Sequence, residues 1–233
     1  MYFLAAQYSL KLAFAATSVS PIWPPSGIAL AGLILLGYRA IPYIFVAAFS
    51  ANLLNLFTHQ LPINSSSILV CAAIGLGNTL EAFVGAYLMQ RWVGAESLLK
   101  RFQNVFRFAA IAALAALASA IPGSLSLIVG GVVPVAAWQG VLGTWWIGDV
   151  CGLLVVTPLL LFGWRAWYER KPWRRWSETI LFFTLLAALL YLVFSPSFNA
   201  SNPLLLLLLL PPIAWAAWRD GGRGVTLCVL VGV

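Results

Sequence analysis

Charged residues are scarce in this sequence. Asp, Glu, Lys and Arg make up 8% of its 233 residues, whereas hydrophobic residues make up 62% and the mean hydropathy is +0.96. A water-soluble domain of this length needs a much more charged surface, and the polar stretches here are too short to form a separate soluble domain. The composition therefore excludes a soluble fold and predicts a protein embedded in the lipid bilayer.

Motifs that would bind a metal or supply a nucleophile are also missing. The single histidine, His59, has no Cys, carboxylate or second His near it in the sequence, and we expect it to be solvated. The three cysteines, Cys71, Cys151 and Cys228, lie in apolar runs without CxxC spacing, which is typical of structural thiols. No HExxH, GxSxG, P-loop or GxGxxG motif is present. We therefore expect no metal, no cofactor and no catalysis within this chain.

Long apolar runs separated by turn signals predict an all-α, polytopic transmembrane bundle. A span needs about 20 residues, and most of the runs are close to that length. We expect eight full helices and the start of a ninth, at 1–17, 25–38, 41–57, 65–91, 103–121, 135–164, 177–194, 203–218 and from 224 onward. The ninth run is still apolar where the sequence stops. We therefore expect residues 1–233 to be a single membrane domain, truncated before its last helices and a cytoplasmic output domain.

The basic residues predict the orientation of these helices. Apart from Lys11, every Lys and Arg falls at or beside the second, fourth, sixth or eighth connection, and the odd-numbered connections have none. Because basic loops stay in the cytoplasm, we expect the even-numbered connections and the N-terminus to be cytoplasmic. The odd-numbered connections, including residues 122–134, should face outward. Short basic loops also argue against nucleic acid as a partner, despite a net charge of +7.

Two acidic residues and one basic residue lie inside predicted helices and away from the basic connections and the helix ends that border them. Glu81 and Asp149 are far from the cytoplasmic loops, and a charge at bilayer depth usually faces the interior of a helical bundle or a watery cavity. Lys11 is the one cation away from the basic connections, so we hypothesise that it pairs with Glu81 or Asp149. Both carboxyl groups are candidates for signal sensing. A purely structural role, as hydrogen-bonding centres of the bundle, remains open for each.

Polar residues on the third and fourth predicted helices extend this candidate site. Gly77, Glu81 and Gly85 share one stripe of the fourth helix, where small residues let a neighbouring helix approach closely, and Asn78 lies beside it. Asn52 and Asn55 share a face of the third helix. We take Asn52 and Asn78 as candidates for ligand contact. The alternative is that these amides bond neighbouring backbone groups.

The stretch GTWWIGDVCG in the sixth predicted helix contains the densest group of candidates. Trp145 and Asp149 fall on one face together with Gly152, so an indole, a carboxylate and open space lie side by side. This combination suits a small polar or cationic ligand. We include Trp146 among the candidates. The competing interpretation is a belt of interfacial tryptophans, to which we assign Trp138.

The stretch SPIWPPSG precedes a helix that is too short to cross a bilayer. Pro24 and Pro25 suit a first helical turn, where a missing N–H has no intrahelical partner anyway. A helix from Pro24 to Tyr38 is about 22 Å long, against an apolar core of about 30 Å. We therefore expect the loop to dip below the outer surface, with Trp23, Pro24, Pro25 and Ser26 at the rim of a cavity. A stiff surface turn with an interfacial Trp is the alternative.

Several stretches together resemble one family. SVSPIWPPSGIALAGLILLGYRAIPYIFVAAFSANLLN, GNTLEAFVGAYLMQR and TWWIGDVCGLLVVTPLLL, in this order, are similar to the first-type MASE domain, a bacterial membrane-associated sensor region. The resemblance covers essentially the whole chain. It implies an input module of the inner membrane, attached to a cytoplasmic histidine kinase or GGDEF diguanylate cyclase. The positions characteristic of the family are Trp23, Pro24, Pro25, Ser26, Gly27, Asn52, Asn78, Glu81, Trp146, Gly148 and Asp149.

These expectations favour a sensory domain in bacterial signal transduction. It would detect a small-molecule ligand or a partner membrane protein and pass the signal to the output domain, which is expected to form a homodimer. A small-solute transporter or substrate-binding membrane subunit is an alternative, because broken helices and midplane charges occur in transporters. No second copy of GNTLEA or WWIGD is visible, which argues against that alternative. A structural module that localises or dimerises a partner is a third interpretation.

Overall fold

The computed structural model describes residues 1–11, 23–93 and 102–168 together with Thr184. Regular structure in these ranges is helical, and the all-α prediction is confirmed for them. The elements are α1 (Tyr2–Lys11), α2 (Pro24–Leu36), α3 (Ile41–Thr58), α4 (Ser65–Trp92), α5 (Phe102–Val129) and α6 (Trp138–Tyr168), with short 3-10 turns at Tyr38–Ala40 and Val135–Ala137. The expected helices beyond residue 176 lie outside the described residues except for Thr184, so the number of spans stays a prediction.

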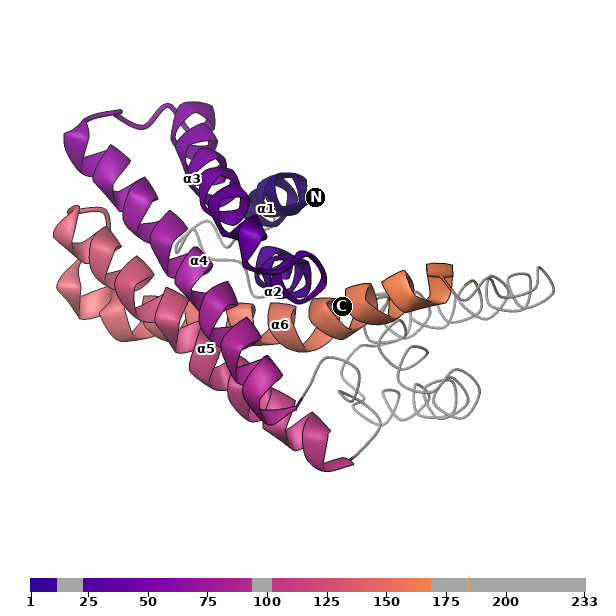
Figure 1. Cartoon of the computed structure of the whole chain (residues 1–233). Helices are drawn as coiled ribbons and strands as arrows, with labels where there is room; N and C mark the ends of the chain where they lie inside the picture. The colour runs from indigo at the N-terminus through magenta and orange to yellow at the C-terminus, as the bar shows by residue number, and fades with distance from the viewer. Residues whose placement is uncertain (12–22, 94–101, 169–183, 185–233) are drawn as a thin grey trace. The chain divides into compact units, whose positions relative to one another are not determined.

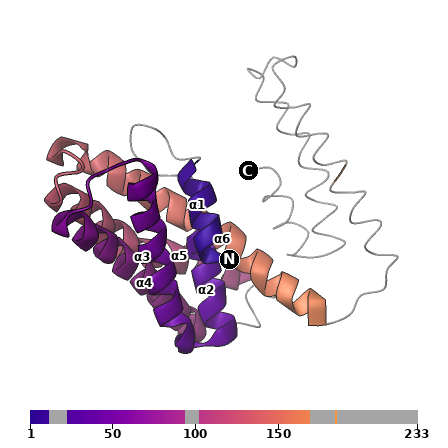
Figure 2. The same cartoon turned by 90° about the horizontal axis from the view of Figure 1, so that it is seen from above.

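The chain divides into two units, Met1–Thr157 and Pro158–Val233. The first unit contains α1 to α5 and most of α6 (Figures 1 and 2). In the second unit, the described residues are the end of α6 and Thr184.

Four stretches of the described chain are long and apolar enough to cross a bilayer. They are Tyr38–Thr58, Ser65–Trp92, Gln103–Val129 and Val135–Leu161. α2 is shorter, with 13 residues, so its axis is about 20 Å long at 1.5 Å per residue. The prediction of a second helix too short to span an apolar core of about 30 Å is confirmed.

The polarity of α4 is reversed relative to a helix of a soluble protein. Leu76 and Leu80 are 60% and 48% exposed, whereas Asn78 and Glu81 on the same helix are 2% and 0% exposed. A helix that buries its polar groups and exposes its leucines is surrounded by an apolar medium. Together with the apolar spans, this arrangement identifies a multi-pass membrane protein.

Local sequence determines where several helices begin and end. α4 starts with a capping box: Asn64 Oδ1 accepts from the Ser67 backbone N–H at 2.9 Å, and Ser67 Oγ accepts from the Asn64 N–H at 2.8 Å. α2 ends at Gly37, whose φ of +76° favours glycine. Gly131, with φ +71°, turns the chain after α5. The connections from α2 to α3, from α3 to α4 and from α5 to α6 are therefore short.

Helix α4 lies at the centre of the first unit, between α3 and α5 (Figures 1 and 2). Its small residues allow this packing: a side chain at Gly75 would meet Phe45 and the backbone of Phe49 in α3. On the side of α5, a side chain at Gly77 would meet Ser119 and Pro122. Gly85, the other glycine of the predicted stripe, lies against Leu30 of α2 and Ala115 of α5, so both stripe glycines stand where neighbouring helices pack closely.

The expected end of the fifth helix was wrong. We expected residues 122–134 to form an outward connection, but α5 continues through Pro122 to Val129. Helical backbone satisfies its own polar groups in an apolar medium, so the chain retains it even across a proline. Serine hydroxyls on the same turns add bonds to backbone carbonyls, from Ser124 to Ile121 at 3.2 Å and from Ser126 to Gly123 at 2.7 Å.

Candidate functional site

Helix α2 begins inside the protein, against α6. Its first residue is Pro24, and the backbone N–H of Trp23 donates to the carbonyl of Gly148 at 2.9 Å. Ser26, in the first turn, is only 2% exposed, and Pro25 is also buried. The predicted dip of this segment into the protein is supported by this burial. The conformation fits the sequence, because prolines at the first positions of a helix leave no unsatisfied N–H group.

The Ser26 hydroxyl bridges two carboxyl groups that come from different helices. Ser26 Oγ lies 2.8 Å from Glu81 Oε2 of α4 and 2.9 Å from Asp149 Oδ1 of α6. Both carboxyl groups are fully buried. Three helices that are distant in sequence therefore meet at one hydroxyl group, and we call Ser26, Glu81 and Asp149 the carboxyl cluster.

Two glycines let α2 and α6 approach closely enough to form this cluster. A Cβ atom at Gly27 would clash with the carbonyl oxygen of Gly152 and with Val156, and a Cβ atom at Gly152 would clash with the carbonyl of Trp23. The hydroxyl of Thr157 adds a hydrogen bond of 3.3 Å to the Gly27 carbonyl. With backbones this close, the short side chain of Ser26 reaches Asp149 directly.

Further polar atoms surround the carboxyl cluster. Within the described part of the chain, four buried side-chain atoms have no hydrogen-bond partner: Glu81 Oε1, Asp149 Oδ2, Trp23 Nε1 and the hydroxyl of Tyr2. Tyr2 comes from α1 and lies near the Trp23 indole and within electrostatic range of both carboxyl groups. Each of these atoms can form another hydrogen bond, which buried polar groups normally do. These four atoms therefore have hydrogen-bonding capacity that their described neighbours do not use.

The electrostatics of the carboxyl cluster are unfavourable if both acids are ionised. Because Glu81 Oε2 and Asp149 Oδ1 both contact Ser26, they lie within about 6 Å of each other, a range in which charges interact strongly. Two like charges about 4 Å apart repel by about 4 kcal/mol at an effective dielectric constant of 20. Among the described side chains, no Lys or Arg hydrogen-bonds to either carboxyl group. The side chain of Lys11 lies outside the described residues, so its pairing with Glu81 or Asp149 stays a prediction.

Sequence comparison assigns the chain to a family. The family model MASE1, a membrane-associated sensor domain, matches residues 1–233. The chain belongs to the MASE1 family. The resemblance indicated by WPPSG, GNTLEA and WWIGD is thereby confirmed over the whole sequence. Comparisons with curated proteins and with solved structures found no match.

The carboxyl cluster of this MASE1 domain unites three of the predicted candidates, and others lie around it. Trp145 flanks Asp149, together with Ser119 of α5. Asn78 bonds to its own helix through the Ile74 carbonyl at 3.0 Å and accepts from Ser119 Oγ at 3.3 Å. These contacts link α5 to α4 through Asn78 and to α6 through Asp149.

Two predicted candidates bond elsewhere. The Asn52 amide donates to the carbonyl of Ala48, one turn back on α3, at 2.9 Å. The Trp146 indole donates to the Ala113 carbonyl of α5 at 2.8 Å. These bonds match the structural interpretation of a helix amide and a helix-to-helix tether. Trp138, expected in an interfacial belt, donates to Ser124 Oγ at 3.1 Å.

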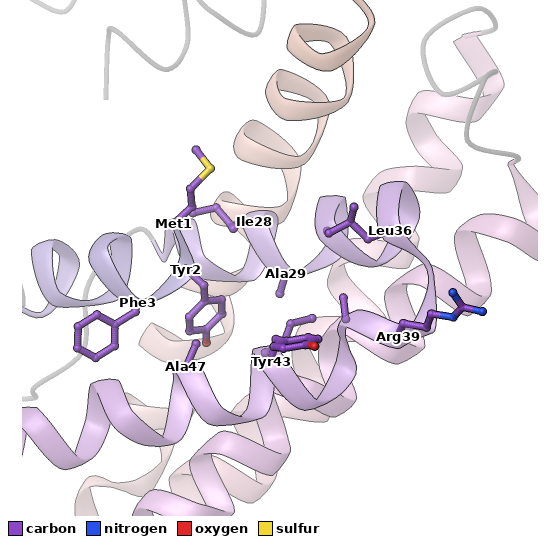
Figure 3. Close-up of a pocket in the computed structure, with 12 residues that line it drawn as sticks. Met1, Tyr2, Phe3, Ile28, Ala29, Leu36, Arg39, Tyr43 and Ala47 are labelled. Carbon is purple, nitrogen blue, oxygen red and sulfur yellow. The ribbon is translucent and has the colours of Figure 1, made fainter.

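A cavity lies beside the carboxyl cluster. Its volume is about 450 Å³, and its lining comes from α1, α2, the turn Tyr38–Ala40 and α3 (Figure 3). Most lining side chains are apolar, Arg39 lies at one end and Phe3 at the other. Tyr2 connects the two features, since it lines the cavity and is within electrostatic range of the two carboxyl groups.

Tyr2 and Ser119 were missed by the analysis of the sequence. Tyr2 stands two residues into an apolar run, and Ser119 is one of several small residues in an alanine-rich helix. Neither position has a local pattern that separates it from ordinary membrane helix. The one available signal for Ser119 is that it is polar within a run that is otherwise apolar.

Proposed function

We propose that this MASE1 domain receives a signal within the bacterial inner membrane and passes it to a cytoplasmic histidine kinase or diguanylate cyclase. The family assignment supports the role of a sensory membrane input domain in signalling proteins. The choice of output enzyme follows from the resemblance of the motifs. The signal is a small-molecule ligand or a partner membrane protein, and the output regions form a homodimer.

The observation that carries this proposal is the convergence of α2, α4 and α6 on the hydroxyl of Ser26. A sensor needs an element with two arrangements whose balance a stimulus can shift. A change in the hydrogen bonding of Ser26 alters the attachment of α2 to both other helices. α2 is also short and lies next to a cavity, so it can move without displacing a full span.

The proposed topology places the N-terminus and Arg39 on the cytoplasmic side. The distribution of basic residues supports it, because they cluster at alternate connections. In this orientation the cavity beside α2 has its Arg39 end toward the cytoplasm. Ser26, in the first turn of α2, contacts Glu81, and Glu81 lies about 24 Å from Ser65 along the axis of α4. The start of α2 therefore lies deeper in the membrane than the start of α4.

The test uses the full-length protein in its native membrane with Asp149→Asn. We expect the output, measured as kinase autophosphorylation or as cyclic diguanylate, to change at least several-fold while the amount of protein in the membrane stays the same. Asn52→Ala is the matched control, because the described hydrogen bond of the Asn52 side chain goes to the Ala48 carbonyl within α3. An Asp149→Asn protein with the same basal output and the same response as the natural protein contradicts a role for the cluster in signalling.

A transporter is the second candidate, favoured by a helix that begins inside the protein next to two buried acids. Vesicles containing the full-length protein would then accumulate a labelled solute, and Glu81→Gln would abolish the accumulation. If Asp149→Asn changes the activity of the output enzyme and the vesicles take up no solute, the results support the sensor instead.

A further inference from the structure

The carboxyl cluster has more hydrogen-bond acceptors than the serine can satisfy. A serine hydroxyl has one proton to donate and lone pairs with which to accept. Ser26 Oγ lies at hydrogen-bond distance from an oxygen of each acid, at 2.8 Å and 2.9 Å. One contact uses the serine proton. The other becomes a hydrogen bond only when the carboxyl group itself carries a proton and donates it to Ser26 Oγ.

We propose that Glu81, Ser26 and Asp149 form a proton-binding site inside the membrane, in which one proton is shared between the two carboxyl groups through the serine hydroxyl. In this state one acid is protonated and donates to Ser26, and Ser26 donates to the other, ionised acid. Reversal of both hydrogen bonds exchanges the two roles without a change in net charge. The ligand of this site is therefore the proton.

The groups that face the site fit a pair with one negative charge. α1 contributes the Tyr2 hydroxyl and the segment before α2 contributes the Trp23 indole N–H, both buried atoms without a partner among the described residues. Tyr2 is within electrostatic range of both acids and lies beside the Trp23 indole, and hydrogen-bond donors of this kind stabilise a negative charge. α5 adds Ser119 beside Asp149. Among the side chains that the structure describes, which do not include Lys11 of α1, the titratable groups found at the cluster are the two acids and Tyr2.

The geometry favours a proton over a metal cation. Oxygen atoms that bind a cation converge on the ion, whereas here both acids converge on a hydroxyl at ordinary O–H···O distances. Within the described residues, no group of three or more His, Cys, Asp and Glu side chains lies together. A cation site would need further oxygen ligands than this cluster provides.

Release of the shared proton changes how α2 is held. The O–H bond of the protonated acid breaks, its electron pair stays on the carboxylate, and the proton passes to water. Two carboxylates then compete for one serine proton, so Ser26 keeps its bond to one helix and loses its bond to the other. The backbone bond from Trp23 to Gly148 holds α2 to α6, and the separation is therefore expected between α2 and α4. That this movement reaches the output enzyme rests on the proposed function; the proton site itself does not.

Infrared spectroscopy of the chain in lipid nanodiscs tests the site directly. At neutral pH we expect a carbonyl stretching band of a protonated carboxylic acid, which disappears as the pH is raised. Glu81→Gln and Asp149→Asn should each remove the whole band. In either variant the new amide group donates an N–H to Ser26 in place of the acid proton. The remaining acid is then ionised, so no protonated carboxylic acid is left to give the band.

A matched pair of serine variants controls for nonspecific changes. Ser26→Ala should shift or remove the band, because its bridging hydroxyl is lost. Ser124→Ala should leave it unchanged, since the buried Ser124 bonds to Ile121 and Trp138 instead. If an amide variant fails to fold, isotope-labelled aspartate and glutamate in the unsubstituted chain provide the same assignment. Both labels should then shift the band, because the two acids share the proton.

Three results would overturn the inference. Absence of a protonated carboxylic acid band that responds to either label means that both acids are ionised and neutralised by another cation, such as Lys11. A band that each single variant retains in part means that the acids are protonated independently. A band that appears only when sodium is replaced by choline at constant pH identifies a cation site. If the infrared results support the proton site but Asp149→Asn leaves the output of the full-length protein unchanged, the proposed signalling function is wrong and the proton site still stands.

Discussion

Ser26 and Asp149 are 123 residues apart in the sequence and are joined by a hydrogen bond of 2.9 Å between the serine hydroxyl and Asp149 Oδ1. The same hydroxyl contacts Glu81, so the beginning of α2 is attached to two long helices at one atom. Close contact of Gly27 with Gly152 makes this attachment possible. The predictions below separate the contribution of the hydroxyl from that of the close packing.

Removal of the bridging hydroxyl should destabilise the fold. Ser26→Ala leaves two buried carboxyl groups without their common partner, and we expect a loss of about 2 kcal/mol in the free energy of unfolding. Unfolding of the purified chain in mixed detergent micelles, followed by circular dichroism, measures this loss. Thr144→Val is the control, because the Thr144 hydroxyl bonds to the Gly140 carbonyl of its own helix. Equal losses in the two variants would show that the bridge adds nothing specific.

Two glycines of α2 should respond oppositely to alanine. A methyl group at Gly27 meets the backbone of Gly152 and the side chain of Val156, whereas nothing lies within 4 Å of a Cβ atom at Gly32. We expect Gly27→Ala to destabilise the chain by about 1–3 kcal/mol through overpacking. Gly32→Ala should be neutral or stabilise α2 by up to about 1 kcal/mol through helix propensity. Thermal unfolding of both variants in the same detergent compares them, and a tolerated Gly27→Ala would refute the close approach of α2 to α6.

The two candidate asparagines should differ in their tolerance of substitution. Asn78 is 2% exposed and bonds to both α4 and α5, whereas Asn52 is partly exposed and bonds within α3. We expect Asn78→Ala to lower the free energy of unfolding by about 1–2 kcal/mol because Ser119 loses its acceptor. Asn52→Ala should change it by less than about 0.5 kcal/mol. A larger effect of Asn52→Ala would indicate a partner for Asn52 beyond its own helix.

The ends of α4 should lie on opposite sides of the membrane. In a cysteine-free background, Ser65→Cys and Arg91→Cys both place an exposed thiol at an end of this helix. A membrane-impermeant maleimide should label Ser65→Cys in cells with a permeabilised outer membrane and Arg91→Cys only in inverted vesicles. The opposite pattern would reverse the proposed orientation. Ser26→Cys should resist the reagent in both preparations, because this position is buried.

Much of the fold follows from the one-dimensional pattern of apolar and polar residues. The predicted starts of α3 and α4, at residues 41 and 65, coincide with those in the structure, because Pro42 at the start of α3 and the cap residue Asn64 mark them locally. The end of α5 was not predicted. A proline usually indicates a helix end, but the apolar surroundings of Pro122 retain the helical backbone.

The candidate site was also predictable in part from the pattern of apolar and polar residues. Glu81 and Asp149 are conspicuous in the sequence because ionisable side chains are unfavourable in an apolar medium, wherever the other helices lie. Asn52 and Asn78 look equivalent in the sequence, yet one bonds within its own helix and the other connects two helices. Their difference depends on which face each helix presents to its neighbours.

The sequence by itself determined that this protein lies in a membrane, where most of its described helices begin, and which buried groups need partners. These features depend on the transfer of each side chain or backbone group into an apolar medium, which is a local property. The tertiary structure alone decided that Glu81 and Asp149 meet at Ser26, with Tyr2 and Ser119 nearby. Hydrogen bonds act over about 3 Å, so only the packing of α2 against α4 and α6 could bring these residues together.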